Sequence, residues 1–143
     1  RLAHQMHVGT LLETIDEATA IVERVGLEGF GITLEPANMI ACGEDCGPDA
    51  IARLAPFLVN VYLQNQVVDE YGPTAIRRRD SIVRVRNIPL DADEGIDFGA
   101  IFEALRTSGY DGPVTVHQSA IEGLPIKDSA RRYYELLSNY MRY

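Results

Sequence analysis

The sequence predicts an α/β fold of four βα units, arranged as one half of a (β/α)8 barrel. A short apolar segment is followed by a loop and an amphipathic helix four times along the chain, which is the repeat of a parallel α/β protein. The segment HVGTLLET after the first strand holds one glycine, so it lacks the Gly-rich loop of a dinucleotide-binding sheet. Polar residues end each strand, and a barrel gathers these ends at the face that carries the active site. These observations favour a barrel over an open sheet.

The first unit begins with a strand over Leu2–His7 and continues with a helix that starts at Thr14. Thr14 and Glu17 have the spacing of a capping box, in which each side chain satisfies a backbone N–H near the start of the helix. Gly26 is placed to end this helix, because glycine readily takes the left-handed conformation found at helix ends. The apolar residues of the helix recur at helical spacing: Ile15, Ala18, Ile21, Val22 and Val25.

The second and third strands are predicted over Phe30–Leu34 and Leu58–Leu63. Between them, Pro48 stands at a favoured first position of a helix, and Pro56 marks the end of that short helix. After the third strand, residues 65–96 are predicted to form a long connection that contains glycine, proline and a run of arginines. A helix then completes the third unit.

The third helix and the fourth unit occupy the rest of the chain. Apolar residues at helical spacing mark the third helix, and Gly109 ends it. Val114–His117 is the fourth strand, and the last helix is predicted to start near Asp128 or Ser129. The apolar faces of the two helices consist of Phe98, Ile101, Phe102 and Leu105, and of Ala130, Tyr133, Tyr134, Leu137, Tyr140 and Met141.

Length and composition limit the classes of protein to consider. The chain has 143 residues, 46% hydrophobic and 24% charged, so residues 1–143 are expected to form a single packed domain. No apolar run approaches the ~20 residues that cross a bilayer, and the N-terminus does not read as a signal peptide, so we expect a cytoplasmic protein without a membrane segment. A net charge of -8 and a pI near 4.8 would repel a phosphate backbone, which argues against a nucleic-acid partner.

The strand ends supply the candidate catalytic and metal-binding residues. Glu35 and His117 are the predicted catalytic groups, because a carboxylate and an imidazole can each take up a proton. Together with His7, they are also the strand-end groups with useful affinity for a divalent metal such as Mn²⁺, Mg²⁺ or Zn²⁺. The alternatives are structural: Glu35 accepts hydrogen bonds from loop amides, and His117 is a half-buried imidazole in the core.

A second set of polar residues is predicted to bind substrate. Amide side chains carry both donors and acceptors, which suits the hydroxyl groups of a sugar, although amides also cap turns. Arginines of the long connection can bind a phosphate or carboxylate through paired hydrogen bonds, although a charge run in a loop is more often solvated. The predicted substrate-binding residues are Gln5, Asn38, Asn65, Gln66 and Arg86, and the other arginines of the connection are Arg77, Arg78, Arg79 and Arg84.

Three segments carry a resemblance to a known family. Pro89–His117 has a Gly then Asp-aromatic pair opening a helix, a Gly-Tyr-x-Gly turn and a strand that ends in a polar residue. This stretch resembles the closing part of the xylose-isomerase-like barrel superfamily of sugar isomerases, epimerases and inosose dehydratases. The segment at residues 35–38 resembles the family's Asp-Pro-Gly-His or Asp-Pro-Gly-Asn motif, and residues 60–65 resemble its strand ending in His-x-x-Asp. The resemblance maps onto the last four of eight strands, the C-terminal half of a TIM barrel that ordinarily takes about 250 residues.

The resemblance implies a divalent cation held by carboxylates and histidine, and in epimerase members a proton exchange between two Glu side chains and the substrate. At the matching positions of this sequence, only Glu35 keeps a carboxylate. An amide cannot abstract a proton, so an exchange between two carboxylates is not available at these positions. The family's Glu, Asp, His, His, Asp and Glu correspond here to Gln5, Glu35, Asn38, Tyr62, Asn65 and His117.

The leading hypothesis is an enzyme that isomerises or epimerises a sugar, keto-sugar or related polyol. Its substrate is a small carbohydrate, and its cofactor is a divalent metal. A degenerate, non-catalytic sugar-binding barrel is the alternative, and an endonuclease acting at abasic sites ranks third, because it needs more histidine and carboxylate ligands and a basic groove. Four βα units leave two outer strands with unpaired backbone groups. We therefore expect either a homo-oligomer or a longer chain of which this is a part.

Overall fold

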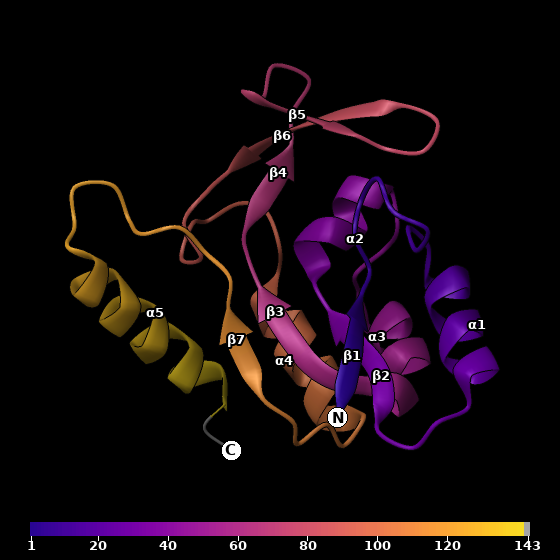
Figure 1. Ribbon diagram of the computed structural model, residues 1–143. Helices are drawn as coiled ribbons and strands as arrows, with labels where there is room; N and C mark the ends of the chain where they lie inside the picture. The colour runs from indigo at the N-terminus through magenta and orange to yellow at the C-terminus, as the bar shows by residue number, and fades with distance from the viewer. Residues whose placement is uncertain (142–143) are drawn as a thin grey trace.

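The computed structural model describes residues 1–141. In this part of the chain, four parallel strands form the main sheet in the order β1-β2-β3-β7, and helices join successive strands (Figure 1). The predicted alternation of strands and helices is confirmed. The strands are β1 (Leu2–Gln5), β2 (Phe30–Leu34), β3 (Leu58–Leu63) and β7 (Val114–Val116). The helices are α1 (Ile15–Val25), α2 (Pro36–Cys42), α3 (Pro48–Leu54), a 3-10 turn η1 (Ala55–Phe57), α4 (Phe98–Thr107) and α5 (Ile126–Met141).

The register of the main sheet brings the C-terminal strand ends to one edge. Gln5 pairs with Thr33 between β1 and β2, and Leu63 pairs with Val116 between β3 and β7. Because all four strands run parallel, the residues that follow their C-terminal ends all lie at the same end of the sheet. The strand-end residues Gln5, Glu35 and His117 therefore lie at one end of the sheet.

The hydrophobic core lies between the sheet and the helices that cover it. Side chains of the central strands β2 and β3 point into this core alternately along each strand. The core also takes the apolar faces of α3 and α4, which contact one another. In Figure 1, α5 instead lies beside the outer strand β7. Deeply buried members of the core include Met6, Ile32, Leu34, Met39, Ile51, Leu54, Val61, Leu63 and Ile101.

The predicted capping box at the start of α1 is present. The Thr14 side chain accepts a hydrogen bond from the Glu17 backbone N–H, and the Glu17 carboxylate accepts one from the Thr14 N–H. Gly26 ends the helix in the left-handed conformation at φ 59°. Both ends of α1 are thus specified by residues within the helix and next to it.

Thr14→Ala should therefore lower the free energy of unfolding by about 1 kcal/mol, because a backbone N–H of the first turn loses its acceptor. Urea denaturation monitored by circular dichroism measures this change. Thr19→Ala, in the same helix, serves as the control, since the Thr19 hydroxyl only donates hydrogen bonds to the carbonyls of Ile15 and Asp16. Equal losses in the two variants would contradict a capping role for Thr14.

The long connection differs from the prediction. Residues 65–96 contain a three-stranded antiparallel sheet in the order β4-β6-β5, formed by β4 (Gln66–Val68), β5 (Thr74–Arg77) and β6 (Ile82–Asn87). The segment IVRVRN of β6 alternates apolar and polar residues, which is the pattern of a half-exposed strand. The sequence predicts this region only as a long connection and does not identify its strands, because the arginines and glycines of the region obscure that alternation.

Two further local predictions need correction. α2 follows Glu35 directly, where no helix was expected, because its seven residues are too few for a recognisable period and no side chain caps its start. Two of the predicted strands are also shorter than expected. His7 and His117 lie beyond the last residues of β1 and β7, so both stand in loops at the site end of the sheet.

No helix within residues 1–141 has the length and apolar character needed to cross a membrane.

Candidate active site

The site is built around Glu35, which follows the last residue of β2. The next residue is a proline, which favours an extended conformation at Glu35, and φ and ψ are -136° and 97°. Glu35 is 1% exposed. Its carboxylate caps no backbone N–H at the start of α2 and faces the neighbouring strand ends. A buried carboxylate requires hydrogen-bond donors, and the neighbouring strand ends supply them.

Three side chains from different parts of the chain converge on the Glu35 carboxylate. Oε2 accepts hydrogen bonds from the Gln5 side-chain amide, at the end of β1, and from Asn38 Nδ2 at 2.8 Å, in the first turn of α2. Oε1 lies 3.1 Å from His117 Nδ1, just beyond β7. Of the predicted site residues, the structure therefore brings Gln5, Glu35, Asn38 and His117 together.

His117 is the exposed member of this group. Its side chain is 58% exposed, against 1% for Glu35, so the imidazole covers the carboxylate and faces outward. The His117 backbone N–H donates to the Leu63 carbonyl at 2.9 Å, which extends the pairing of β7 with β3 by one bond. The ring also contacts the ring of Tyr62, with centroids 5.4 Å apart. His117 is thus held by the backbone, by an aromatic ring and by a carboxylate.

The contact with Glu35 determines which nitrogen of His117 can react. An ionised carboxylate only accepts hydrogen bonds, so a bond between Glu35 Oε1 and His117 Nδ1 requires the proton to be on Nδ1. In the neutral imidazole, Nε2 then carries the free lone pair. A proton or a metal ion is therefore taken at Nε2.

His7 and the predicted metal set are arranged differently. The His7 ring is exposed, and Nδ1 lies 2.8 Å from the Val8 carbonyl oxygen. Among residues 1–141, no group of three or more His, Cys, Asp or Glu side chains could hold a metal ion. Glu35 and His117 provide two donors, fewer than the three protein ligands of an ordinary catalytic metal site. The described residues could therefore supply at most two ligands of a metal site.

Asn65 and Gln66 form hydrogen bonds within the protein. The buried Asn65 amide donates to the carbonyls of Pro89 and Glu94, at 3.0 and 3.2 Å, and accepts from the Ile96 N–H at 3.0 Å. Gln66 Nε2 donates to the Ala37 carbonyl at 2.5 Å. These bonds position the long connection and α2 around the site. Substrate binding by the two amides stays a prediction.

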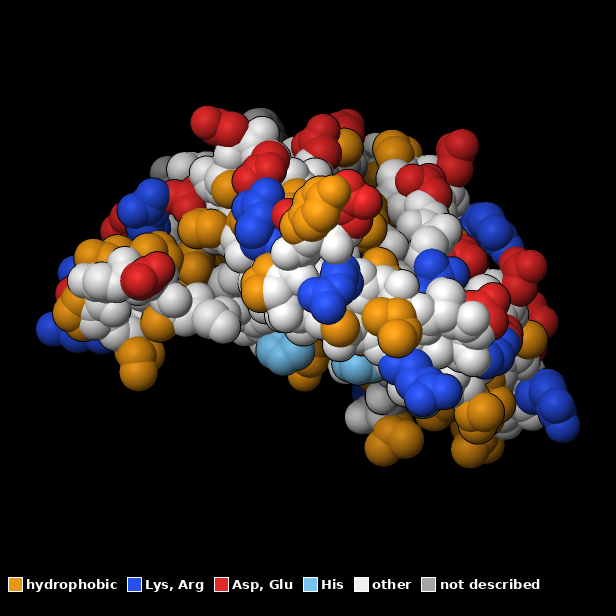
Figure 2. Space-filling model, turned by 90° about the horizontal axis from the view of Figure 1, so that it is seen from above, with side chains coloured by type: hydrophobic (Ala, Val, Ile, Leu, Met, Phe, Trp, Pro, Cys, Tyr) orange, Lys and Arg blue, Asp and Glu red, His pale blue; other side chains and the backbone are white. Residues whose placement is uncertain are grey.

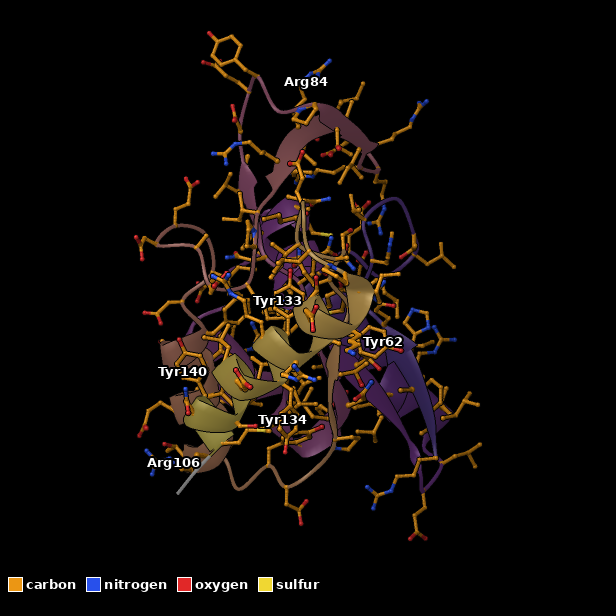
Figure 3. The ribbon with its side chains drawn as sticks, turned by 90° about the vertical axis from the view of Figure 1, so that its left-hand side faces the viewer. Tyr62, Arg84, Arg106, Tyr133, Tyr134 and Tyr140 are labelled. Carbon is orange, nitrogen blue, oxygen red and sulfur yellow. The ribbon has the colours of Figure 1, made fainter. Side chains whose placement is uncertain are left out.

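Arg86 lies in the small antiparallel sheet. Its guanidinium forms ion pairs with Asp69, at 3.4 Å, and with Glu94, at 3.1 Å. Its neighbour Arg84 donates to the Gly72 carbonyl. Figure 3 shows Arg84 on the upper sheet, well above Tyr62 of the main sheet. Substrate binding by Arg86 likewise stays a prediction, and it would require Arg86 to exchange its acidic partners.

Tyr62 is a contributor that the sequence did not single out as a site residue. It lies on β3, the strand between those that lead to Glu35 and His117. Its ring packs against the ring of His117 at an interplanar angle of 52°. Alternation along β3 places Tyr62 on the same face as Asn60 and Gln64 and opposite the core residues, a signal that could have identified it.

The face at this end of the molecule is exposed. In Figure 2, which looks down on it, histidine side chains lie close to Lys or Arg side chains near one edge.

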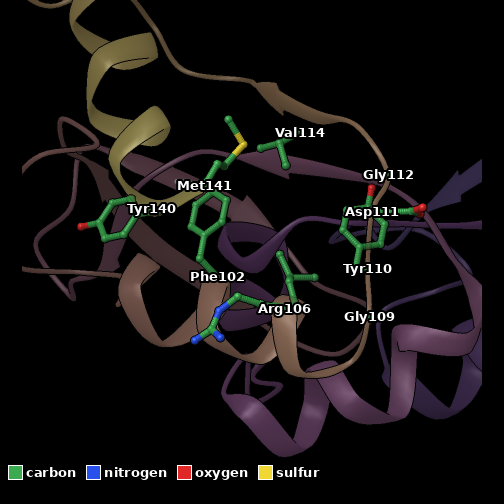
Figure 4. A pocket seen from close by; sticks show the side chains of 10 residues that line it. Phe102, Arg106, Gly109, Tyr110, Asp111, Gly112, Val114, Tyr140 and Met141 are labelled. Carbon is green, nitrogen blue, oxygen red and sulfur yellow. The ribbon is translucent and has the colours of Figure 1, made fainter. Parts of the chain in front are cut away.

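An apolar pocket lies at the other end of the sheet, before the start of β7 (Figure 4). It is lined by Phe102, Tyr110, Tyr140 and Met141 among others. Residues at the N-terminal ends of barrel strands serve stability more than chemistry. The Glu35 cluster is therefore the stronger candidate for an active site.

Comparison with known proteins places the chain in a family. The model of the xylose isomerase-like TIM barrel family matches residues 1–138. A xylose isomerase-like TIM barrel protein from Mycobacterium smegmatis, solved in complex with magnesium, is 20% identical with a TM-score of 0.68, over 99% of this chain and 45% of its own. A xylose isomerase domain protein from Planctomyces limnophilus is 22% identical with a TM-score of 0.66, over 94% and 44%.

A third similar structure is a D-allulose 3-epimerase from Methylomonas sp., 15% identical with a TM-score of 0.67, over 95% of this chain and 47% of its own. No curated protein matches the chain. The chain spans less than half the length of these structures. The predicted α/β fold, corresponding to half of a (β/α)8 barrel, is confirmed by these matches.

Proposed function

Because the chain belongs to the xylose isomerase-like TIM barrel family, we propose that it carries part of the active site of an enzyme that isomerises or epimerises a sugar, keto-sugar or related polyol. The observation that supports this proposal is the contact between Glu35 and His117 at the C-terminal ends of the barrel strands. A buried carboxylate that orients an exposed imidazole is a common arrangement for acid–base chemistry. Membership of the family alone does not specify the reaction.

In the proposed reaction, Nε2 of His117 takes a proton from a substrate carbon that bears a hydroxyl group and adjoins the carbonyl. The electron pair of the broken C–H bond moves into a C–C double bond, and the carbonyl oxygen takes the π electrons of the C=O bond and becomes the negatively charged oxygen of an enediolate. Return of the proton to the former carbonyl carbon, together with transfer of the hydroxyl proton from one oxygen of the enediolate to the other, gives the isomer. Its return to the original carbon from the opposite face gives the epimer, which requires a second proton donor.

Glu35 acts through His117 and not directly on the substrate. Its carboxylate is buried beneath the imidazole and holds the proton on Nδ1. When His117 becomes positively charged, the same carboxylate stabilises that charge. Gln5 and Asn38 donate to the other carboxylate oxygen and fix its direction. The amide at Gln5 thus has a positioning role in place of proton transfer.

We propose that the enzyme uses a divalent metal, with Glu35 as its donor on this chain, because the single free lone pair of His117, on Nε2, takes the proton. The remaining ligands would come from outside the described residues, since the chain spans less than half the length of similar structures. When bound, such a metal polarises the substrate carbonyl and so acidifies the adjoining C–H bond. One of the similar structures was solved in complex with magnesium.

Exchange of substrate hydrogen with solvent tests the proposal. The intact protein is incubated with a panel of ketoses and aldoses in D2O, and loss of the C–H signal next to the carbonyl is followed by proton NMR. We expect exchange for at least one sugar. EDTA should suppress it, and Mn²⁺, Mg²⁺ or Zn²⁺ should restore it. Sugar binding without exchange under any metal condition would instead support a non-catalytic sugar-binding barrel. The observation that favours this alternative is that the site holds a single carboxylate.

A further inference from the structure

A second site lies at the same end of the sheet. The loop that follows β1 and the turn between β5 and β6 enclose an opening of about 580 Å³. The two segments are far apart in the sequence, and in Figure 1 they meet above α1 and α2. The opening is lined by Gly9, Thr10 and Leu11 from the loop and by Arg77, Arg78 and Arg79 from the turn.

Two acidic side chains hold these segments together. The buried Glu13 carboxylate accepts hydrogen bonds from the backbone N–H groups of Gly9, at 2.6 Å, and Arg79, at 3.0 Å. The Arg79 guanidinium binds Glu17 at 2.7 Å and the Leu11 carbonyl at 3.2 Å. The hydrogen bond from Arg79 holds the pKa of Glu17 at about 2, so Glu17 stays ionised. The carboxylates of Glu13 and Glu17 thus already accept hydrogen bonds from residues that line the opening.

Gly9 allows the walls to approach closely. Its φ is +75°, and a Cβ at this position would lie 2.8 Å from the Arg77 carbonyl oxygen. A larger residue would push the turn away from the loop. The opening is therefore shaped by specific contacts and not by two loops that happen to be adjacent.

Arg77 and Arg78 remain without an acidic partner in the part of the chain that the structure describes. The Arg78 guanidinium lies against Gly43, 3.2 Å from where a Cβ would stand. Its Nε is buried and has no hydrogen-bond partner among the same residues. A buried donor without an acceptor is costly, and a guanidinium binds carboxylate and phosphate through paired bonds.

We propose that this opening binds an oxyanion, a carboxylate or phosphate group at the end of a sugar substrate, with Arg78 and Arg77 as its donors. The assignment to a substrate rests on the proposed function. α2 begins directly after Glu35 and ends next to Gly43, so one helix of seven residues, about 10 Å long, separates the Glu35 cluster from Arg78. An extended pentose or hexose that carries a terminal acidic group bridges a distance of this order.

The proposal favours a small anion over a nucleic acid. The chain carries a net charge of -8, and a phosphate backbone needs a broad basic surface. Arg77 and Arg78 instead offer a local pair of cations inside an opening whose other arginine is already paired. Such a site is matched to one anionic group.

Isothermal titration of the intact protein with inorganic phosphate tests the site. We expect saturable binding that Arg78→Gln weakens at least about tenfold. Arg77→Gln, at an exposed position, should also weaken it and guards against a folding defect in the first variant. Arg24→Gln removes the same charge from an exposed position of α1 and should leave the affinity unchanged. No saturable binding, or equal losses in Arg78→Gln and Arg24→Gln, would overturn the proposal.

The same titration separates this site from the proposed reaction. Glu35→Gln should bind phosphate as the unmodified protein does, because Glu35 makes no contact with the opening. Glucose 6-phosphate, gluconate and glucose are then compared to identify the anionic group. The acidic sugar with the larger loss of affinity in Arg78→Gln carries the preferred group. Equal affinities for all three sugars, or tighter binding of a DNA duplex that also depends on Arg78, would contradict a sugar oxyanion site.

Discussion

His117→Gln is expected to lower kcat/KM of the sugar reaction by about two to four orders of magnitude, the usual contribution of a positioned acid–base group. Glutamine retains polarity and similar size, and it cannot accept and return a proton. Within the cluster, the imidazole is the group that can exchange a proton with the substrate, because Gln5 and Asn38 are amides and Glu35 is buried beneath it. Steady-state kinetics on the sugar that shows hydrogen exchange measures the loss.

The matched control is His4→Gln, which changes another exposed histidine on β1 that has no contact with Glu35. It should retain full activity. Glu35→Gln should lower activity as well, because the amide carries no negative charge and can donate to Nδ1 as well as accept from it, so the proton is no longer held on Nδ1. Nitrogen NMR of the His117 ring should then show a changed tautomer, a signal that a purely structural role of Glu35 would not produce.

A double variant tests whether Glu35 acts through His117. If it does, Glu35→Gln should cause little further loss of activity in the His117→Gln background, because the two residues act as a unit. Additive losses would show that the carboxylate acts on the substrate independently. Full activity in His117→Gln would remove the imidazole from the mechanism altogether.

Asn65→Ala is expected to lower the free energy of unfolding by about 3 kcal/mol, the second large effect. The Asn65 side chain makes three hydrogen bonds to backbone groups of residues 89–96, and the bond from the Ile96 N–H is fully buried. Alanine cannot replace them, so buried polar groups of the connection lose their partners. Urea denaturation followed by circular dichroism gives the difference in stability.

Asn87→Ala provides the comparison, since Asn87 is exposed and its side chain makes no hydrogen bond within residues 1–141; its effect should stay within about 0.5 kcal/mol. Gly95→Ala offers a second probe of the same contact. Gly95 has φ +90°, and a Cβ there would lie 2.3 Å from Asn65 Oδ1. If Asn65→Ala keeps its stability and loses affinity for sugar, Asn65 binds substrate, as the sequence suggested.

The order of helices and strands followed from local patterns in the sequence. The capping box at Thr14 and the glycine that ends α1 involve residues a few positions apart, so the sequence alone contains both partners of each interaction. The same holds for the four parallel strands, whose apolar segments and polar ends are continuous in the chain. The small sheet of residues 66–87 was missed because its strands are short and mostly exposed, which weakens the apolar signal.

The sequence by itself determined the α/β fold and the polar character of the strand ends, because these depend on periodicity and on turn chemistry between near neighbours. The half barrel followed from those polar ends, from the number of βα units and from the resemblance to the family. Only the tertiary structure decided which polar groups meet. Glu35 and His117 are 82 residues apart, and they touch because the sheet places a single strand between those that precede them. Asn65 and Arg86 also carry polar side chains, but their partners lie in the long connection and not at the Glu35 cluster. Side-chain contacts of that kind depend on the three-dimensional path of the chain.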